Sequence, residues 1–156
     1  MTDTKRIIYA CDFSPASLAA FPHALHLARL TGAELTFFHV LPAPVGIFSV
    51  DGGYVPQQIW NELYTRLRAE ADAETDRLIK QAVAAGVPAT ASIVDGGTAD
   101  ARIVQAAHDL KADLLVLGTH GRTGIAKFFL GSVAARVVAT ALCPVLTVRA
   151  PEPTEA

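Results

Sequence analysis

The sequence predicts an α/β fold in which helices cover both faces of a single open five-stranded parallel sheet. Five apolar runs are continuous rather than alternating, which is typical of strands buried on both faces. Segments with an apolar period of 3.6 residues separate these runs, so strands and helices alternate along the chain. Hydrophobic residues make up 51% of the 156 residues, enough for the core of one domain spanning residues 1–156.

The predicted strands are these five apolar runs, and right-handed crossovers are expected between them. They comprise Arg6 to Cys11, Glu34 to Leu41, Ala89 to Val94, Asp113 to Leu117 and Pro144 to Val148. The third run gives the weakest strand signal of the five.

The first predicted helix lies between Ser14 and Gly32. Ser14 is a good N-cap, Pro15 suits the first helical position, and Gly32 suits the end of the helix. Pro22 lies inside the helix and has no N–H to donate to the Leu18 carbonyl. We therefore expect a kink there, at a cost of up to about 3 kcal/mol.

The second predicted helix is long, from about Pro56 to Ala85. Its buried face is predicted to contain Ile59, Leu63, Leu67, Ala71, Leu78 and Ala82. The segment before it, residues 43–55, mixes proline and glycine with apolar residues and is too long for an ordinary connection. Two interpretations stay open for this segment: a lid or interface loop, and a variable surface insertion.

Two shorter helices complete the predicted order of elements. The third helix runs from an N-cap at Thr98 to Leu110. The fourth begins at Ser132 and is predicted to direct Val133, Val137 and Val138 inward. The tail, residues 150–156, is expected to be disordered.

Charge and hydropathy exclude several classes of protein. Lys and Arg number 13 and Asp and Glu number 15, so the net charge of −2 does not support a broad nucleic-acid surface. No run approaches the roughly 20 apolar residues of a membrane span, and the N-terminus lacks a signal-peptide pattern. We therefore expect a cytoplasmic protein without membrane insertion.

The two cysteines do not suggest a disulfide framework or a metal cluster. Cys11 ends a predicted strand, whereas Cys143 precedes one. Parallel strands would therefore place the two thiols at opposite ends of the sheet, which argues against a disulfide. We interpret both residues as buried free thiols.

The richest chemistry follows the fourth strand, where the sequence reads GTHGRTGIAKFFLGSV over residues 118–133. Ligands of open parallel sheets bind beyond the carboxyl ends of the strands. Gly118 and Gly121 are expected to let backbone amides approach an anion, and residues 131–133 to offer the N–H groups of a helix start. Arg122 and Lys127 add positive charge. This pattern predicts a phosphate-binding site.

The spacing of this segment has a close match in a known family. Gly118, Gly121, Gly131 and Ser132 fit the signature G-x2-G-x9-G-[ST], and Asp12 follows the first strand in YACDFS. On these residues the chain resembles the universal stress proteins, specifically their ATP-binding branch. The resemblance covers nearly the whole chain, including HVLP after the second strand and CPVLTV near the C-terminus. It implies the sheet order 3-2-1-4-5 and a role in the stress response.

The resemblance also implies where a nucleotide would lie. Adenine would contact the backbone at Ala10 and Val40, Asp12 would face the nucleoside, and the glycine segment would hold the phosphates. The ligand would be ATP, ADP or AMP, with Mg²⁺ or Mn²⁺ bound through the phosphates. The implied nucleotide-binding residues are Ala10, Asp12, Val40, Leu117, Gly118, Thr119, His120, Gly121, Arg122, Thr123, Gly124, Gly131, Ser132 and Val133.

A homodimer is a further implication of the resemblance, with the fifth strand pairing with its twofold mate. The sequence supports this independently, because an apolar strand at a sheet edge invites pairing. That strand contains Val145, Leu146 and Val148. A signalling partner is also expected, although its identity does not follow from the sequence.

Two functions compete at this site. The first is a nucleotide-binding regulatory module, because the site shows phosphate donors but no nucleophile paired with a base. The second is a slow ATPase or autophosphorylating phosphotransferase, in which Asp12 assists Mg²⁺ and Ser132 or Thr123 accepts phosphate. His39 is interpreted as a structural residue buried in its strand. For His120, contact with phosphate or ribose and a structural role both stay open.

Overall fold

Five parallel strands pair side by side in the order β3-β2-β1-β4-β5, which confirms the predicted class and order. The computed structural model describes residues 3–42, 56–120 and 130–151. The predictions for residues 43–55, for residues 121–129 and for the tail from residue 152 therefore lie outside the described residues. The strands are β1 (Arg6–Ala10), β2 (Glu34–Leu41), β3 (Ala89–Asp95), β4 (Leu114–Gly118) and β5 (Val145–Val148).

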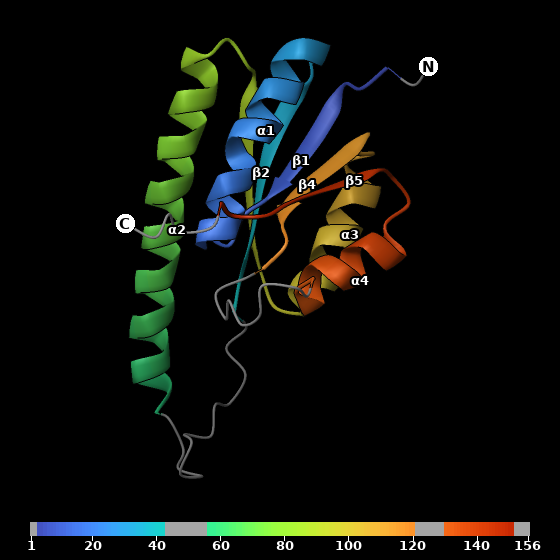
Figure 1. The fold of residues 1–156 in the computed structure, drawn as a ribbon. Coiled ribbons are helices and arrows are strands. Elements are labelled where there is room, and N and C mark those ends of the chain that lie inside the picture. Colours follow the sequence, from blue (N-terminus) through green and yellow to red (C-terminus); the bar gives the residue numbers. More distant parts are fainter. Residues whose placement is uncertain (1–2, 43–55, 121–129, 152–156) are drawn as a thin grey trace, which may run out of the picture.

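Helices cover both faces of this sheet (Figure 1). They are α1 (Pro15–Thr31), α2 (Gln57–Ala84), α3 (Ala99–Asp109) and α4 (Ser132–Thr140). On one face, Ile7 and Tyr9 pack in a core with α1 and α2. On the other face, Ile8 and Ala10 pack with α3 and α4. This split follows from the alternation of side chains along β1.

The register of the strands leaves a gap at the carboxyl end of β1. Ala10, the last residue of β1, lies opposite Phe38 of β2 and Leu117 of β4. Beyond this point β2 continues to Leu41 and stays paired with β3. The chain after β1 turns into α1, so β2 and β4 flank an opening that β1 does not fill.

The start of α1 is built as predicted and closes around the end of β1. The Ser14 side chain caps the helix by accepting a hydrogen bond from the Ser17 N–H, and Gly32 ends it in the left-handed conformation. The helix is continuous through Pro22, and the kink there stays a prediction. The buried Tyr9 hydroxyl donates to the Ser17 carbonyl at 2.6 Å, and burial holds its pKa well above the usual range.

The predicted buried face of α2 is wrong in its first half. Ile59 and Leu63 are 56% and 44% exposed, whereas Trp60 is buried. Positions spaced strictly four apart drift around a helix by about 40° at each step, since one turn takes 3.6 residues. The buried positions instead alternate steps of three and four, as in the series Ala71, Thr75, Leu78 and Ala82.

One predicted inward residue of α4 is also wrong. Val138 is 49% exposed, whereas Val137 is fully buried and Ala134, three residues earlier, is buried beside it. Adjacent helical positions point about 100° apart, so a short helix with one buried face accommodates Val137 or Val138 but not both.

Among the described residues, no helix has the length and apolar content that a membrane crossing requires.

Candidate functional site

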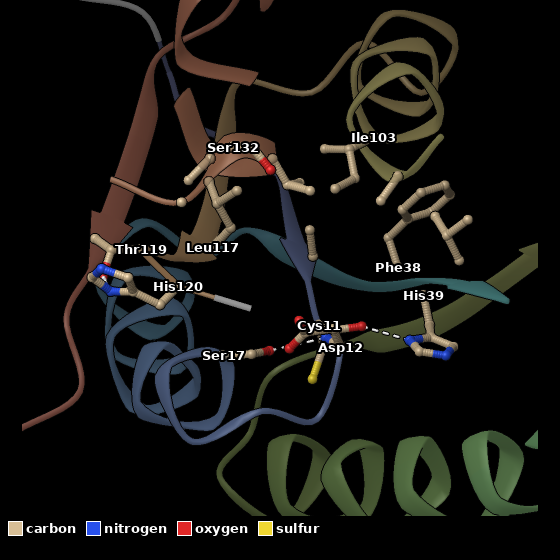
Figure 2. Close-up of a pocket in the computed structure, with 17 residues that line it drawn as sticks. Cys11, Asp12, Ser17, Phe38, His39, Ile103, Leu117, Thr119, His120 and Ser132 are labelled. Carbon is tan, nitrogen blue, oxygen red and sulfur yellow. Dashed lines mark hydrogen bonds between the residues drawn. The ribbon is translucent and has the colours of Figure 1, made fainter. Parts of the chain in front are cut away.

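A cavity of about 300 Å³ opens at the carboxyl ends of β1, β2 and β4 (Figure 2). Every predicted site residue that the structure describes lines it: Ala10, Asp12, Val40, Leu117, Gly118, Thr119, His120, Gly131, Ser132 and Val133. The predicted residues Gly121, Arg122, Thr123 and Gly124 lie outside the described residues, as does Lys127. The structure thus brings segments more than 100 residues apart in sequence to one pocket.

Two glycines allow these segments to meet. A Cβ on Gly118 would lie 2.6 Å from the backbone of Ala16 and Ser17 in α1, and one on Gly131 would lie 2.8 Å from the Thr119 carbonyl oxygen. The missing Cβ of Gly118 thus makes room for the backbone of α1, a reason that the sequence alone did not reveal. The approach of an anion at this glycine stays a prediction. Close backbone packing between β4, α1 and the start of α4 builds the pocket wall.

The start of α4 points a set of open donors at this pocket. Gly131 is the N-cap, and its N–H donates to the Thr119 carbonyl at 2.7 Å. The expectation that this amide is open is thus wrong. The first helical bond runs from the Ala135 N–H to the Gly131 carbonyl. The N–H groups of Ser132, Val133 and Ala134 consequently find no acceptor among the described residues, and the helix dipole makes this end positive.

Asp12 is held by the turn that connects β1 to α1. Its N–H donates to the Ser17 hydroxyl at 3.1 Å, and its Oδ1 accepts the Ser14 N–H at 2.9 Å. Phe13, between them, has a φ of 61°, in the left-handed region that bulky residues adopt rarely. The turn therefore fixes a carboxylate at the wall of the pocket.

Thr119 and His120 form a polar corner of the pocket. The Thr119 N–H extends the sheet by donating to the Val148 carbonyl at 2.8 Å. Its hydroxyl pairs with Nδ1 of His120 at 2.8 Å. The other ring nitrogen of His120, Nε2, is buried and has no hydrogen-bond partner among the described residues. Buried polar atoms in proteins nearly always have a hydrogen-bond partner, and a ligand in the pocket could provide one for this nitrogen.

The opposite end of the pocket is apolar. Figure 2 shows Phe38 and Ile103 on one side and Thr119 and His120 on the other. Residues that line the pocket without having been predicted as site residues are Cys11, Ser17, Phe38, His39, Ala99, Ile103 and Ala134. Phe38 was within reach of sequence reasoning, because it shares a face of β2 with Val40. Ala99 and Ile103 lie one turn apart at the start of the helix that follows β3.

The backbone of Val40 borders the gap beyond β1. Along β2, the Leu35 N–H donates to the Pro88 carbonyl, which lies on the side of β3. The Phe38 carbonyl accepts the Cys11 N–H on the opposite side, where β1 lies. Backbone groups alternate in direction along a strand, so Val40 faces the same side as Phe38. Because β1 has ended there, the N–H and C=O of Val40 face the pocket and meet no backbone partner among the described residues.

Two further residues of the pocket, His39 and Cys11, are buried. His39 is 9% exposed, as predicted, and its Nδ1 donates to the Cys11 carbonyl at 2.7 Å. Both cysteines are free, as expected, but Cys143 is only half-buried. Burial raises the pKa of the Cys11 thiol above its ordinary value.

Comparisons with known proteins identify the family and the fold of this chain. The family model of the "Universal stress protein family" matches residues 3–149. Universal stress protein MJ0531 of Methanocaldococcus jannaschii is 34% identical over 148 residues, which is 95% of this chain and 84% of that protein. The solved structure of MJ0577, from the same organism, is 29% identical, with a TM-score of 0.81 over 97% of this chain and 100% of that chain. A universal stress protein crystallised in complex with cAMP is 26% identical, with a TM-score of 0.69 over 96% and 100% of the two chains.

Proposed function

Because this chain belongs to the universal stress protein family, we propose that its pocket binds an adenine nucleotide, namely ATP, ADP or AMP. One observation carries the proposal. The pocket has an apolar end bordered by the open backbone of Val40 and a polar end bordered by the open amides of α4. A base and a polyanion at the two ends of one ligand match this division.

The apolar end suits a purine. Phe38, Ile103 and Leu117 offer apolar surface to a flat ring. The N–H and C=O of Val40 offer a donor beside an acceptor, the complement of the adenine 6-amino group and its neighbouring ring nitrogen. The related protein crystallised with cAMP, which contains the same base, supports this assignment.

The polar end suits phosphate. Amides at a helix N-terminus bind phosphate oxygens through hydrogen bonds and the helix dipole. Ser132, Val133 and Ala134 supply these amides, and Nε2 of His120 would gain the partner that it lacks. Asp12, between the two ends, would face the ribose.

A divalent cation would be held mainly by the phosphates. The described residues contain no group of three or more His, Cys, Asp or Glu side chains that could form a metal cage. Mg²⁺ and Mn²⁺ fit such a site when phosphate oxygens provide most of their ligands. Asp12 is the carboxylate of the described pocket that would assist, and the cation would neutralise phosphate charge.

Calorimetry tests the binding directly. Titration of ATP, ADP and AMP into the purified protein should give a dissociation constant between about 1 μM and 1 mM for at least one of them, a common range for nucleotide sites. Adenosine and inorganic triphosphate should each bind more weakly than ATP, because each occupies one end of the pocket. Heats within error for all three nucleotides would contradict the proposal.

The role proposed for the bound nucleotide is regulatory. Binding would shift the protein toward a state that a signalling partner recognises in the stress response. A slow ATPase or autophosphorylation activity is the second candidate, favoured by the Ser132 side chain, which lines the pocket from the first position of α4. Release of phosphate over hours with Mg²⁺ would favour this second candidate.

A homodimer through β5 completes the proposal. β5 is an edge strand paired with β4, and its residues Val145, Leu146 and Val148 are half-buried in the single chain. The Pro144 carbonyl accepts a hydrogen bond from an N–H of β4, and the Val148 carbonyl accepts one from the Thr119 N–H. The backbone groups of the even-numbered residues of β5 therefore face β4, and those of Thr147 face outward. A second β5 could pair with these outward groups.

Proline at position 147 should therefore prevent the dimer. Thr147→Pro removes an outward N–H but no hydrogen bond to β4, and edge strands tolerate such a proline. Sedimentation equilibrium should report a dimer for the wild type and a monomer for this variant, while Thr147→Val should remain dimeric. A wild-type protein that sediments as a monomer, or a dimeric Thr147→Pro variant, would contradict the proposed pairing.

A further inference from the structure

We propose that His39 is a positioning residue that keeps the backbone of Val40 open for the base. The proposal rests on the adenine-binding function above. Its structural basis lies at the point where β1 stops pairing with β2. There the Cys11 N–H still donates to the Phe38 carbonyl at 2.9 Å.

If the parallel ladder between β1 and β2 continued regularly, the Val40 N–H would be occupied by a hydrogen bond. After the bond from Cys11 to Phe38, the next bond in the pattern would run from the Val40 N–H to the Cys11 carbonyl. That bond is not formed. Instead, Nδ1 of His39 lies 2.7 Å from the same carbonyl oxygen. Because a carbonyl only accepts, Nδ1 carries the proton and takes the place of the Val40 amide.

Packing against a second ring holds His39 in this position. The Phe13 ring lies against it, with centroids 4.7 Å apart and planes inclined by 40°. Phe13 reaches this place from a left-handed backbone conformation, which the bond from the Ser14 N–H to the Asp12 carboxylate supports. An unfavourable backbone conformation beside a binding pocket is typical of functional sites. Figure 2 shows the His39 ring beside the end of β1, directed at the Cys11 carbonyl.

This arrangement would determine which base binds. An open peptide N–H and C=O match adenine, whose 6-amino group donates and whose neighbouring ring nitrogen accepts. In hypoxanthine, the base of ITP, a 6-oxo group and a protonated ring nitrogen reverse that order. Without His39, the Val40 N–H would turn to the Cys11 carbonyl and the preference for adenine would fall. The phosphate end of the pocket would be unaffected.

Two substitutions separate the donor of His39 from its bulk. Leucine fills a similar volume without a donor, and asparagine places an amide nitrogen the same number of bonds from the backbone as Nδ1. His39→Leu should bind ATP about tenfold more weakly and lower the ratio of ATP to ITP affinity about tenfold, with inorganic triphosphate affinity unchanged. His39→Asn should retain most of the wild-type ratio. Equal losses of ATP, ITP and triphosphate affinity in His39→Leu would overturn the proposal.

Amide hydrogen exchange tests the same arrangement without any nucleotide. In the ligand-free wild type, the Val40 amide should exchange at least about tenfold faster than that of Phe38, a ladder residue on the same side of β2. In His39→Leu the Val40 amide should become protected, and in His39→Asn it should stay open. A Val40 amide as protected as that of Phe38 in the wild type would overturn the proposal, even if neither variant folds. If no nucleotide binds but the exchange pattern holds, the proposed function fails while the role of His39 at the strand end stands.

Discussion

Gly118→Ala is expected to lower the free energy of unfolding by about 3 kcal/mol, the upper range for overpacking a core. The added methyl group would lie 2.6 Å from the backbone carbon of Ala16 and the backbone nitrogen of Ser17. Neither atom belongs to a side chain that could rotate away, so β4 and α1 must separate. Urea denaturation followed by circular dichroism measures this loss as a lower midpoint with an unchanged slope.

The same substitution should also weaken nucleotide binding by at least about tenfold, because separation of β4 from α1 displaces the pocket residues that both elements carry. Ser17 accepts the Asp12 N–H, so a displaced α1 carries Asp12 with it. Gly32→Ala is the matched control. It forces a side chain into a left-handed position with a φ of 69° but meets no atom within 4 Å. It should cost about 1 kcal/mol and leave nucleotide affinity unchanged. Equal effects of the two variants on stability and affinity would contradict the packing role of Gly118.

These glycines illustrate what the sequence can and cannot predict. The pocket-lining positions after β1 and β4 follow from a local rule, because residues that succeed parallel strands gather at one edge of the sheet. Why Gly118 must be glycine is not local, since the atoms it avoids belong to a helix about 100 residues earlier in the chain. The bond that occupies the Gly131 amide is also hidden, because the Thr119 carbonyl that accepts it lies after a different strand and meets Gly131 only in the folded chain.

The apolar end of the pocket shows the same limit. Phe38 and Ile103 carry an ordinary core pattern in sequence, and both belong to the buried cluster between the sheet and the helices α3 and α4. Their second role arises only because β1 ends at Ala10 and leaves one edge of that cluster open. His39 likewise has the pattern of a buried strand residue, and only its contact with the Cys11 carbonyl distinguishes it. A strand end is defined by its neighbours, which no single stretch of sequence contains.

Ser132→Pro should weaken ATP binding about 10- to 100-fold while the fold is retained. The substitution removes the first open amide of α4, and a hydrogen bond to a charged group contributes about 1.5–3 kcal/mol. Proline is favoured at the first position of a helix. It also requires an extended residue before it, and Gly131 already has φ −58° and ψ 154°. Circular dichroism should therefore match the wild type.

The control for this variant is Ser132→Ala, which removes the hydroxyl but keeps the amide. If the amide binds phosphate, calorimetry should show a large loss of ATP affinity for the proline variant and a small one for alanine. Adenosine should bind both variants like the wild type, because the base end of the pocket is untouched. Equal losses in the two variants would assign the contact to the hydroxyl, and undiminished ATP affinity in both would place the phosphates away from α4. The difference between the two variants thus isolates one backbone N–H, the kind of group on which phosphate recognition at a helix start depends.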